Sequence, residues 1–193
     1  MIKTINNFLT DGELKLAQDY WLVREPSLKP CEQCPNSVAT YADPLSETFL
    51  KIKKQIVEDN VGEPIIPTYS FSRLYYKEGL LAKHSDRPSC EVSVTLNIFG
   101  DKEWEISFHK LKDDDSREID SNDKPISVIT KPGDAVVYEG PKYEHWRNPY
   151  EGEKCMQVFF HYVRANGPYT AFAMDGRQYF GQTKEDGMKG IWK

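Results

Sequence analysis

The feature that most constrains the fold is a series of short β-prone segments between Pro67 and Val163. Each segment is rich in β-branched or aromatic residues, and turns containing Gly, Pro or Asp separate it from the next. The expected strands are Thr68 to Tyr76, Ala82 to Asp86, Glu91 to Phe99, Trp104 to His109, Ser127 to Thr130, Asp134 to Tyr138, His145 to Asn148 and Cys155 to Val163. Many short strands with this spacing are typical of an antiparallel jelly roll.

The first 66 residues are predicted to be mainly helical. Thr10 and Glu13 have the spacing of a capping box, and apolar residues follow at helix-like intervals as far as Trp21. A second helix is expected over Leu45 to Asp59, whereas Pro26 to Pro44 is rich in Pro, Cys, Asn and Asp and is expected to be irregular. The predicted fold class is therefore α+β and mainly β: a double-stranded β-helix (jelly roll) with N-terminal helices packed on one sheet.

A chain of 193 residues buries enough surface to fold as one domain without a stabilising metal or disulfide. We expect helical support over residues 1–66, a jelly-roll core over 67–164 and a tail over 165–193 that is either a lid or an ordered wrap. Residues 112–123 are highly charged, which predicts a solvated loop.

The charge pattern argues against some partners. The 25 Lys and Arg residues are outnumbered by 30 Asp and Glu residues, giving a net charge of −5, and no basic cluster exceeds the Lys53-Lys54 pair. This balance argues against a nucleic-acid-binding surface. No segment approaches the roughly 18 apolar residues of a membrane span, and the first residues do not resemble a signal peptide, so a cytoplasmic location is expected. The oligomeric state stays open.

The candidate chemistry lies at two of the four histidines. His84 and Asp86 are two residues apart, and this spacing on a strand directs both side chains to the same face. His145 lies in a later predicted strand and is a candidate third ligand. Two imidazoles and one carboxylate on one face form the facial triad that suits non-haem Fe(II). His161 lies in an apolar strand and is expected to be a hydrogen-bonded core histidine.

Three segments around these residues share a pattern that extends over most of the predicted core. Residues 73–86 contain a Tyr-x-x-Gly motif followed by His84-x-Asp86, and residues 93–98 contain Ser-x-Thr-Leu. Residues 133–138, then His145 and residues 157–162, form the closing half of the pattern. In this order and spacing, the segments resemble the 2-oxoglutarate- and Fe(II)-dependent dioxygenases, in particular the prolyl-4-hydroxylase-like group.

This resemblance implies a function and a ligand set. His84, Asp86 and His145 are expected to bind Fe(II). The implied activity is hydroxylation of a C–H bond in a peptidyl or small-molecule substrate, with 2-oxoglutarate and O2 as cosubstrates and succinate and CO2 as co-products. The related halogenases lack the carboxylate ligand, so Asp86 favours hydroxylation.

The sequence departs from the family pattern at the residue that anchors the 2-oxoglutarate C5 carboxylate. Lys154 has nearly the expected distance from His145, but alignment of the aromatic pair at 159–160 places Cys155 at the anchor position. Arg147 lies two residues after His145 and shares its strand face, and a guanidinium binds a carboxylate through paired hydrogen bonds. Arg147 and Lys154 are both candidates, and Arg73 is the next.

Neutral hydrogen bonds to the cosubstrate are expected from facing strands, with Tyr75, Thr95 and Asn97 as candidates. The alternative function is a cupin-like jelly roll that binds a metal or small ligand without oxygenase activity. Cys31 and Cys34 form a single Cys-x-x-Cys motif. A zinc site needs further ligands and a redox motif is normally followed by a helix, so we expect a loop with unpaired thiols.

Overall fold

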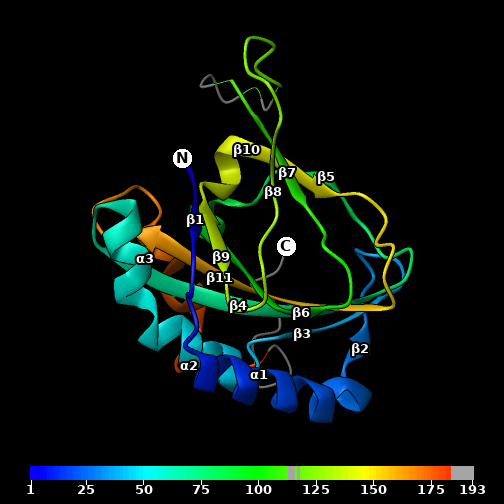
Figure 1. Cartoon of the computed structure of the whole chain (residues 1–193). Helices are drawn as coiled ribbons and strands as arrows, with labels where there is room; N and C mark the ends of the chain where they lie inside the picture. The colour runs from blue at the N-terminus through cyan, green and yellow to red at the C-terminus, as the bar shows by residue number, and fades with distance from the viewer. Residues whose placement is uncertain (113–115, 117, 184–193) are drawn as a thin grey trace.

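The computed structural model describes residues 1–112, 116 and 118–183, which form two antiparallel β-sheets and a layer of helices (Figure 1). The larger sheet has seven strands in the order β1-β9-β6-β11-β4-β3-β2, and the smaller has four in the order β5-β10-β7-β8. The strands are β1 (Ile2–Ile5), β2 (Lys29–Pro30), β3 (Ser37–Tyr41), β4 (Ile65–Tyr76), β5 (Leu81–His84), β6 (Val92–Gly100), β7 (Ile106–Lys110), β8 (Ile126–Val128), β9 (Ala135–Tyr138), β10 (Tyr143–Arg147) and β11 (Lys154–Arg164).

Each predicted core strand overlaps one of the strands β4 to β11, and the expected class, mainly β with N-terminal helices on one sheet, is confirmed. The helices are α1 (Asp11–Arg24), α2 (Pro44–Ile52) and α3 (Lys54–Val61), and short 3-10 segments are η1 (Glu25–Ser27), η2 (Pro88–Cys90), η3 (Gly140–Lys142) and η4 (Thr170–Gly176). Figure 1 shows the three helices on the outer face of the larger sheet. Among the described residues, no helix is long and apolar enough to cross a membrane.

The capping box predicted from the sequence begins α1. The Glu13 amide donates to Thr10 Oγ1 at 3.3 Å and the Thr10 amide donates to Glu13 Oε2 at 2.8 Å. The single helix expected over 45–59 is wrong, because the chain leaves helical geometry at Lys53 and forms α2 and α3. The Lys53 ammonium forms an ion pair with Glu13 at 2.6 Å, which connects the residue between α2 and α3 to α1.

The expectation of an irregular segment over 26–44 is also wrong in part. Residues 37–41 form β3, which pairs with β4, and β2 extends the sheet by one more strand. β1 adds a strand at the opposite edge by pairing with β9. These short segments gain their hydrogen bonds from strands distant in sequence, which local composition does not reveal.

The long strand β4 separates the core from the candidate site. Ser70 and Ser72 face the helices, where they bond to Glu47 and Ser46. The alternate side chains of β4, which include Phe71, face the smaller sheet. The main apolar core therefore lies between the larger sheet and the helices, and the other face of β4 is left for a cavity.

The described part of the C-terminal tail packs on the domain as an ordered wrap. Arg177 donates to Glu47 Oε2 at 2.7 Å, and both side chains are almost fully buried. Asp175, in η4, accepts a hydrogen bond from Tyr41 at 2.8 Å and contacts Arg87 at 3.0 Å. Residues 184–193 of the tail, and residues 113–115 and 117 of the expected charged loop, lie outside the described residues.

We predict that Arg177→Met lowers the free energy of unfolding by about 3–5 kcal/mol, because it leaves the Glu47 carboxylate buried without its cation. The measurement is denaturant unfolding. Lys154→Met is the control, since Lys154 is half-exposed and pairs with Glu25 at the surface; its cost is expected to stay below about 1 kcal/mol. Equal losses in the two variants would contradict the assigned role of the buried pair.

Candidate metal centre and cavity

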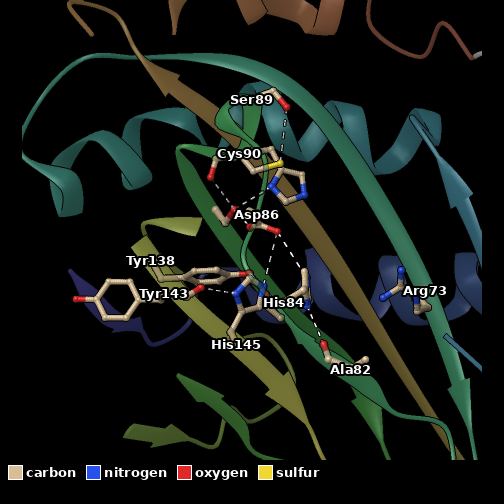
Figure 2. A network of polar contacts seen from close by, with 12 residues as sticks. Arg73, Ala82, His84, Asp86, Ser89, Cys90, Tyr138, Tyr143 and His145 are labelled. Atoms are coloured by element: carbon tan, nitrogen blue, oxygen red, sulfur yellow. Dashed lines mark hydrogen bonds and ion pairs between the residues drawn. The ribbon is translucent and has the colours of Figure 1, made fainter. Parts of the chain in front are cut away.

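Two histidines and one aspartate meet between the sheets. His84 ends β5 and lies directly across from His145 of β10, with ring centroids 4.2 Å apart. The Nε2 atoms of His84 and His145 each lie 3.7 Å from Asp86 Oδ1. Figure 2 shows both imidazoles directed at this carboxylate. One ligand atom from each residue lies within 4.8 Å of the others, which is close enough for one metal ion.

Backbone carbonyls set the tautomers of both histidines. His84 Nδ1 lies 2.9 Å from the Ala82 carbonyl, and His145 Nδ1 lies 3.1 Å from the Tyr143 carbonyl. A carbonyl oxygen only accepts, so each Nδ1 carries the hydrogen and each neutral ring presents the Nε2 lone pair. Burial lowers the pKa of His145, which favours this neutral form. The donor set fits a divalent transition metal such as Fe(II).

Asp86 lies beyond the end of β5, so strand alternation is the wrong explanation for its orientation. Its backbone amide donates to the Gly140 carbonyl at 3.1 Å, and Ser93 Oγ donates to its Oδ2 at 2.8 Å. The Asp86 carboxylate lies against Gly140, where an added Cβ would be 2.3 Å from Oδ2. Ser93 and Gly140 therefore hold Asp86, although the sequence indicated only a strand residue and a turn.

A second group of possible ligands, Asp86, Cys90 and His161, also lies within 4.8 Å. Hydrogen bonds already engage this side of Asp86, because Ser93 Oγ contacts both Asp86 Oδ2 and His161 Nδ1, the latter at 3.0 Å. The two carboxylate oxygens thus have different roles. Oδ1 faces His84 and His145, and Oδ2 is held by the larger sheet.

The metal-ligand cluster opens into a cavity of about 470 Å³. Its wall is largely aromatic, with two arginines and the three candidate ligands. The lining residues are Gln33, Tyr41, Tyr69, Phe71, Arg73, Leu81, His84, Asp86, Arg87, Tyr138, His145, Phe159 and His161. His161 is buried and hydrogen-bonded as the sequence suggested, and its position in the cavity wall was missed. The sequence did contain a signal for this position, because His161 and Phe159 are two residues apart on one strand and so face the same side.

The two candidate anchors lie in different places. Arg147 is buried between the sheets, where it donates to the Trp104 carbonyl at 2.7 Å and to Gln157 Oε1 at 3.3 Å. Its Nε has no hydrogen-bond partner among the described residues. Lys154 lies away from the metal-ligand cluster and binds Glu25 at 2.7 Å. Arg73, the third candidate, lines the cavity (Figure 2).

The three neutral candidates are buried or half-buried behind the cavity wall. The Tyr75 hydroxyl accepts a hydrogen bond from Arg73 at 2.9 Å. Thr95 Oγ1 lies 3.5 Å from the hydroxyl of Tyr138, which in turn lies 3.5 Å from His145 Nε2. The Asn97 amide nitrogen donates to the Thr130 carbonyl at 2.7 Å, and its Oδ1 has no hydrogen-bond partner among the described residues. Tyr138 is a cavity residue that the sequence did not single out.

No family model and no curated protein matches the sequence, but solved structures match the fold of the chain. HygX from Streptomyces hygroscopicus, solved with nickel, 2-oxoglutarate and hygromycin B, matches with a TM-score of 0.64 at 11% identity, over 86% of this chain and 83% of that one. A Pseudomonas putida prolyl-4-hydroxylase matches with a TM-score of 0.63 at 14% identity, over 86% and 93%. A 2OG-Fe(II) oxygenase family oxidoreductase from Burkholderia pseudomallei matches with a TM-score of 0.63 at 16% identity, over 86% of each chain.

The chain has the fold of these oxygenases. This similarity agrees with the family resemblance drawn from the sequence motifs. It extends over 86% of this chain in each of the three comparisons.

We predict that Gly140→Ala weakens binding of Mn²⁺ or of Fe(II) without oxygen by about 10- to 100-fold, the usual effect of disturbing a group that positions a ligand. The added Cβ displaces the Asp86 carboxylate. Calorimetric titration measures the affinity. Gly12→Ala is the matched control, because a Cβ there meets nothing within 4 Å. Unchanged affinity in Gly140→Ala would show that Asp86 does not hold the metal.

Proposed function

We propose that this protein is an Fe(II)- and 2-oxoglutarate-dependent dioxygenase that hydroxylates a C–H bond of a peptidyl or small-molecule substrate. The observation that carries the proposal is the convergence of His84, Asp86 and His145 in the wall of a cavity that is open to solvent on one side. The oxygenase fold of the chain supports it. The division of β4 to β11 into four strands of the larger sheet and four of the smaller sheet supports assignment of this core as a double-stranded β-helix.

His84, Asp86 and His145 would hold Fe(II) from one side and leave its other positions facing the cavity. Bound Fe(II), together with 2-oxoglutarate and O2, supplies an oxidant strong enough for an unactivated C–H bond, and succinate and CO2 are the co-products. The carbonyls of Ala82 and Tyr143 fix both rings, and Ser93 fixes the carboxylate. Fixed ligands of this kind maintain the open coordination positions that the chemistry requires.

Arg147 is the residue that we propose for the 2-oxoglutarate C5 carboxylate. It lies on the same strand as His145, and within the described chain it forms no ion pair with any carboxylate. Burial lowers the pKa of Arg147, so its charge lacks a local compensating anion. The Nε–H has no partner in the part of the chain that the structure describes, and the contact with Gln157 is long at 3.3 Å, which leaves donors for a carboxylate.

Arg147 itself does not line the cavity, and residues in the wall and behind it would position the ligands and exclude water. Tyr138 lies beside His145, and burial raises the pKa of its phenol, so it acts as a neutral hydroxyl. Tyr75 and Thr95 lie close enough to Arg147 and Tyr138 to supply further neutral donors. The aromatic side chains of Phe71, Phe159 and Tyr69 cover the substrate side of the cavity. Their chemistry favours a substrate with an apolar part, either a small molecule or a side chain of a peptide.

We predict that His84→Ala abolishes 2-oxoglutarate turnover, measured as succinate release, while the far-ultraviolet circular dichroism spectrum is unchanged. The fold is retained because His84 lies outside the main apolar core and is 40% exposed in its side chain. His109→Ala is the matched control, since His109 bonds to the Asp123 carbonyl away from the cavity. Iron-dependent succinate release that persists in His84→Ala would remove this residue from the metal site.

We also predict a visible charge-transfer band when Fe(II) and 2-oxoglutarate are added without oxygen. The band requires the keto acid to chelate the iron, so it distinguishes the oxygenase from a cupin-like binding protein. Metal binding without the band and without succinate formation would support the cupin-like alternative.

The anchor is tested by comparing 2-oxoglutarate affinities. We expect Arg147→Lys to weaken binding by about 1.5–3 kcal/mol, because a point charge replaces paired charge-assisted hydrogen bonds. Lys154→Ala is the control and is expected to have no effect, since Lys154 binds Glu25 outside the cavity. The measurement is the 2-oxoglutarate KM at saturating Fe(II). An unchanged KM in Arg147→Lys with a raised KM in Arg73→Lys would move the anchor to β4.

A further inference from the structure

The loop between β2 and β3 holds two thiols beside the cavity. Cys31 and Cys34 lie in this loop, and the intervening Gln33 lines the cavity. The loop is fixed by backbone groups: the Cys31 amide donates to the Ser37 carbonyl at 3.0 Å, and Ser37 Oγ donates to the Cys34 carbonyl at 2.7 Å. Both thiols are free, so the fold presents a constrained dithiol.

The two thiols contact each other and differ in environment. Cys34 is buried in a small apolar cluster with Tyr75 and Phe159, and Cys31 is half-buried against this cluster. The Cys34 thiol donates a hydrogen bond to Cys31, and this bond lowers the pKa of Cys31 and raises that of Cys34. Cys31 is also the more exposed thiol, and Cys34 is 1% exposed, so Cys31 is the thiol that a small oxidant reaches first and the nucleophile of the pair.

The charged group that faces these thiols is Arg73 of β4. Arg73 is 5% exposed, and within the described chain it forms no ion pair with a carboxylate. One of its terminal nitrogens donates to the Tyr75 hydroxyl, and its Nε has no hydrogen-bond partner there. Arg73 also lowers the pKa of Cys31, and the acidic neighbour on the loop, Glu32, is exposed. A Cys31 thiolate is thus the anion available to this buried cation.

The other two cysteines provide an internal contrast. Cys90 and Cys155 are buried, and burial raises the pKa of both thiols. Neither has another cysteine in its sequence neighbourhood. Reactivity is therefore expected at one end of the dithiol and not at the remaining thiols.

We propose that Cys31 and Cys34 form a peroxide-reactive dithiol that closes into a disulfide beside the cavity of the candidate active site. The Cys31 thiolate attacks one oxygen of hydrogen peroxide, the O–O bond breaks, and the products are a Cys31 sulfenic acid and hydroxide. The Cys34 thiol then attacks the Cys31 sulfur, and the S–O bond breaks with release of water. The two cysteines together lose two electrons, and peroxide is reduced to hydroxide and water.

This oxidation changes the charge of the cavity wall. In the reduced protein the Cys31 thiolate lies beside Arg73, and the pair is close to neutral. The disulfide removes the negative charge and leaves the Arg73 guanidinium as an uncompensated cation on the lining of the cavity. The site is therefore a peroxide-sensitive modification site, and its chemistry is independent of the proposed oxygenase activity.

The first test uses the reduced full-length protein with hydrogen peroxide as the probe. After alkylation of the remaining thiols and proteolysis, we expect the peptide with Cys31 and Cys34 to be two hydrogens lighter and unalkylated. The peptides with Cys90 and Cys155 are expected to stay reduced. Absence of the disulfide after complete oxidation of added dithiothreitol, or equal oxidation of all four cysteines, would overturn the proposal.

The second test assigns the roles of the two thiols. In Cys34→Ser, we expect Cys31 to form a sulfenic acid that dimedone traps, because no thiol is left to resolve it. In Cys31→Ser, Cys34 is expected to give no dimedone adduct at the same peroxide dose. A dimedone adduct on Cys34 in Cys31→Ser, or none on Cys31 in Cys34→Ser, would contradict the assignment.

The third test addresses Arg73. We expect Arg73→Met to shift the pH profile of Cys31 alkylation by iodoacetamide towards higher pH, and circular dichroism checks that the variant is folded. Lys154→Met is the matched control, because it removes a half-exposed cation that pairs with Glu25 and does not affect the pKa of Cys31. An unchanged profile in a folded Arg73→Met protein would remove Arg73 from the site. The dimedone test remains informative if that variant does not fold.

Discussion

The arrangement of the site depends on one carboxylate that joins the two sheets. Asp86 Oδ1 faces His84 and His145 of the smaller sheet, and Oδ2 accepts a hydrogen bond from Ser93 of the larger sheet. Gly140 allows this, since any side chain there would occupy the position of the carboxylate. Without the contact to Ser93, the charged oxygens would be free to rotate, and the two imidazoles would lose a fixed third ligand.

Much of the fold, and the grouping of His84, Asp86 and His145, could be predicted because the signals are local. Alternating β-prone segments indicate strands, and two histidines with a nearby aspartate form a rare combination of ligand types. The supports of Asp86 could not be predicted, since Gly140 has only the signature of a turn and its role depends on a contact across 54 positions of chain (140 − 86). Likewise β3 is stable because β4 offers it an open edge.

Lys154 shows why spacing alone is insufficient near a strand. A one-residue shift in register reverses the face to which each side chain points. Phe159 faces the cavity, so Cys155 and Gln157 share its face, and Lys154 faces the opposite side towards Glu25. The aromatic register of β11 therefore predicts the orientation of its side chains better than distance from His145. The tail adds a further element that local pattern misses, because Asp175 binds two cavity residues, Tyr41 and Arg87.

Three buried arginines illustrate how the molecule balances charge around this site. Arg177 has an internal partner, the Glu47 carboxylate. Burial lowers the pKa of Arg147, and no neighbouring group outweighs this effect, which agrees with the proposal that its counter-ion is a bound carboxylate. Burial also opposes the charge of Arg73, but Tyr75 and the thiols of Cys34 and Cys31 outweigh it and raise the pKa of Arg73. Because an uncompensated buried cation is costly, the opposite shifts of Arg147 and Arg73 favour different counter-ions for them: an exchangeable carboxylate for Arg147 and a resident thiolate for Arg73.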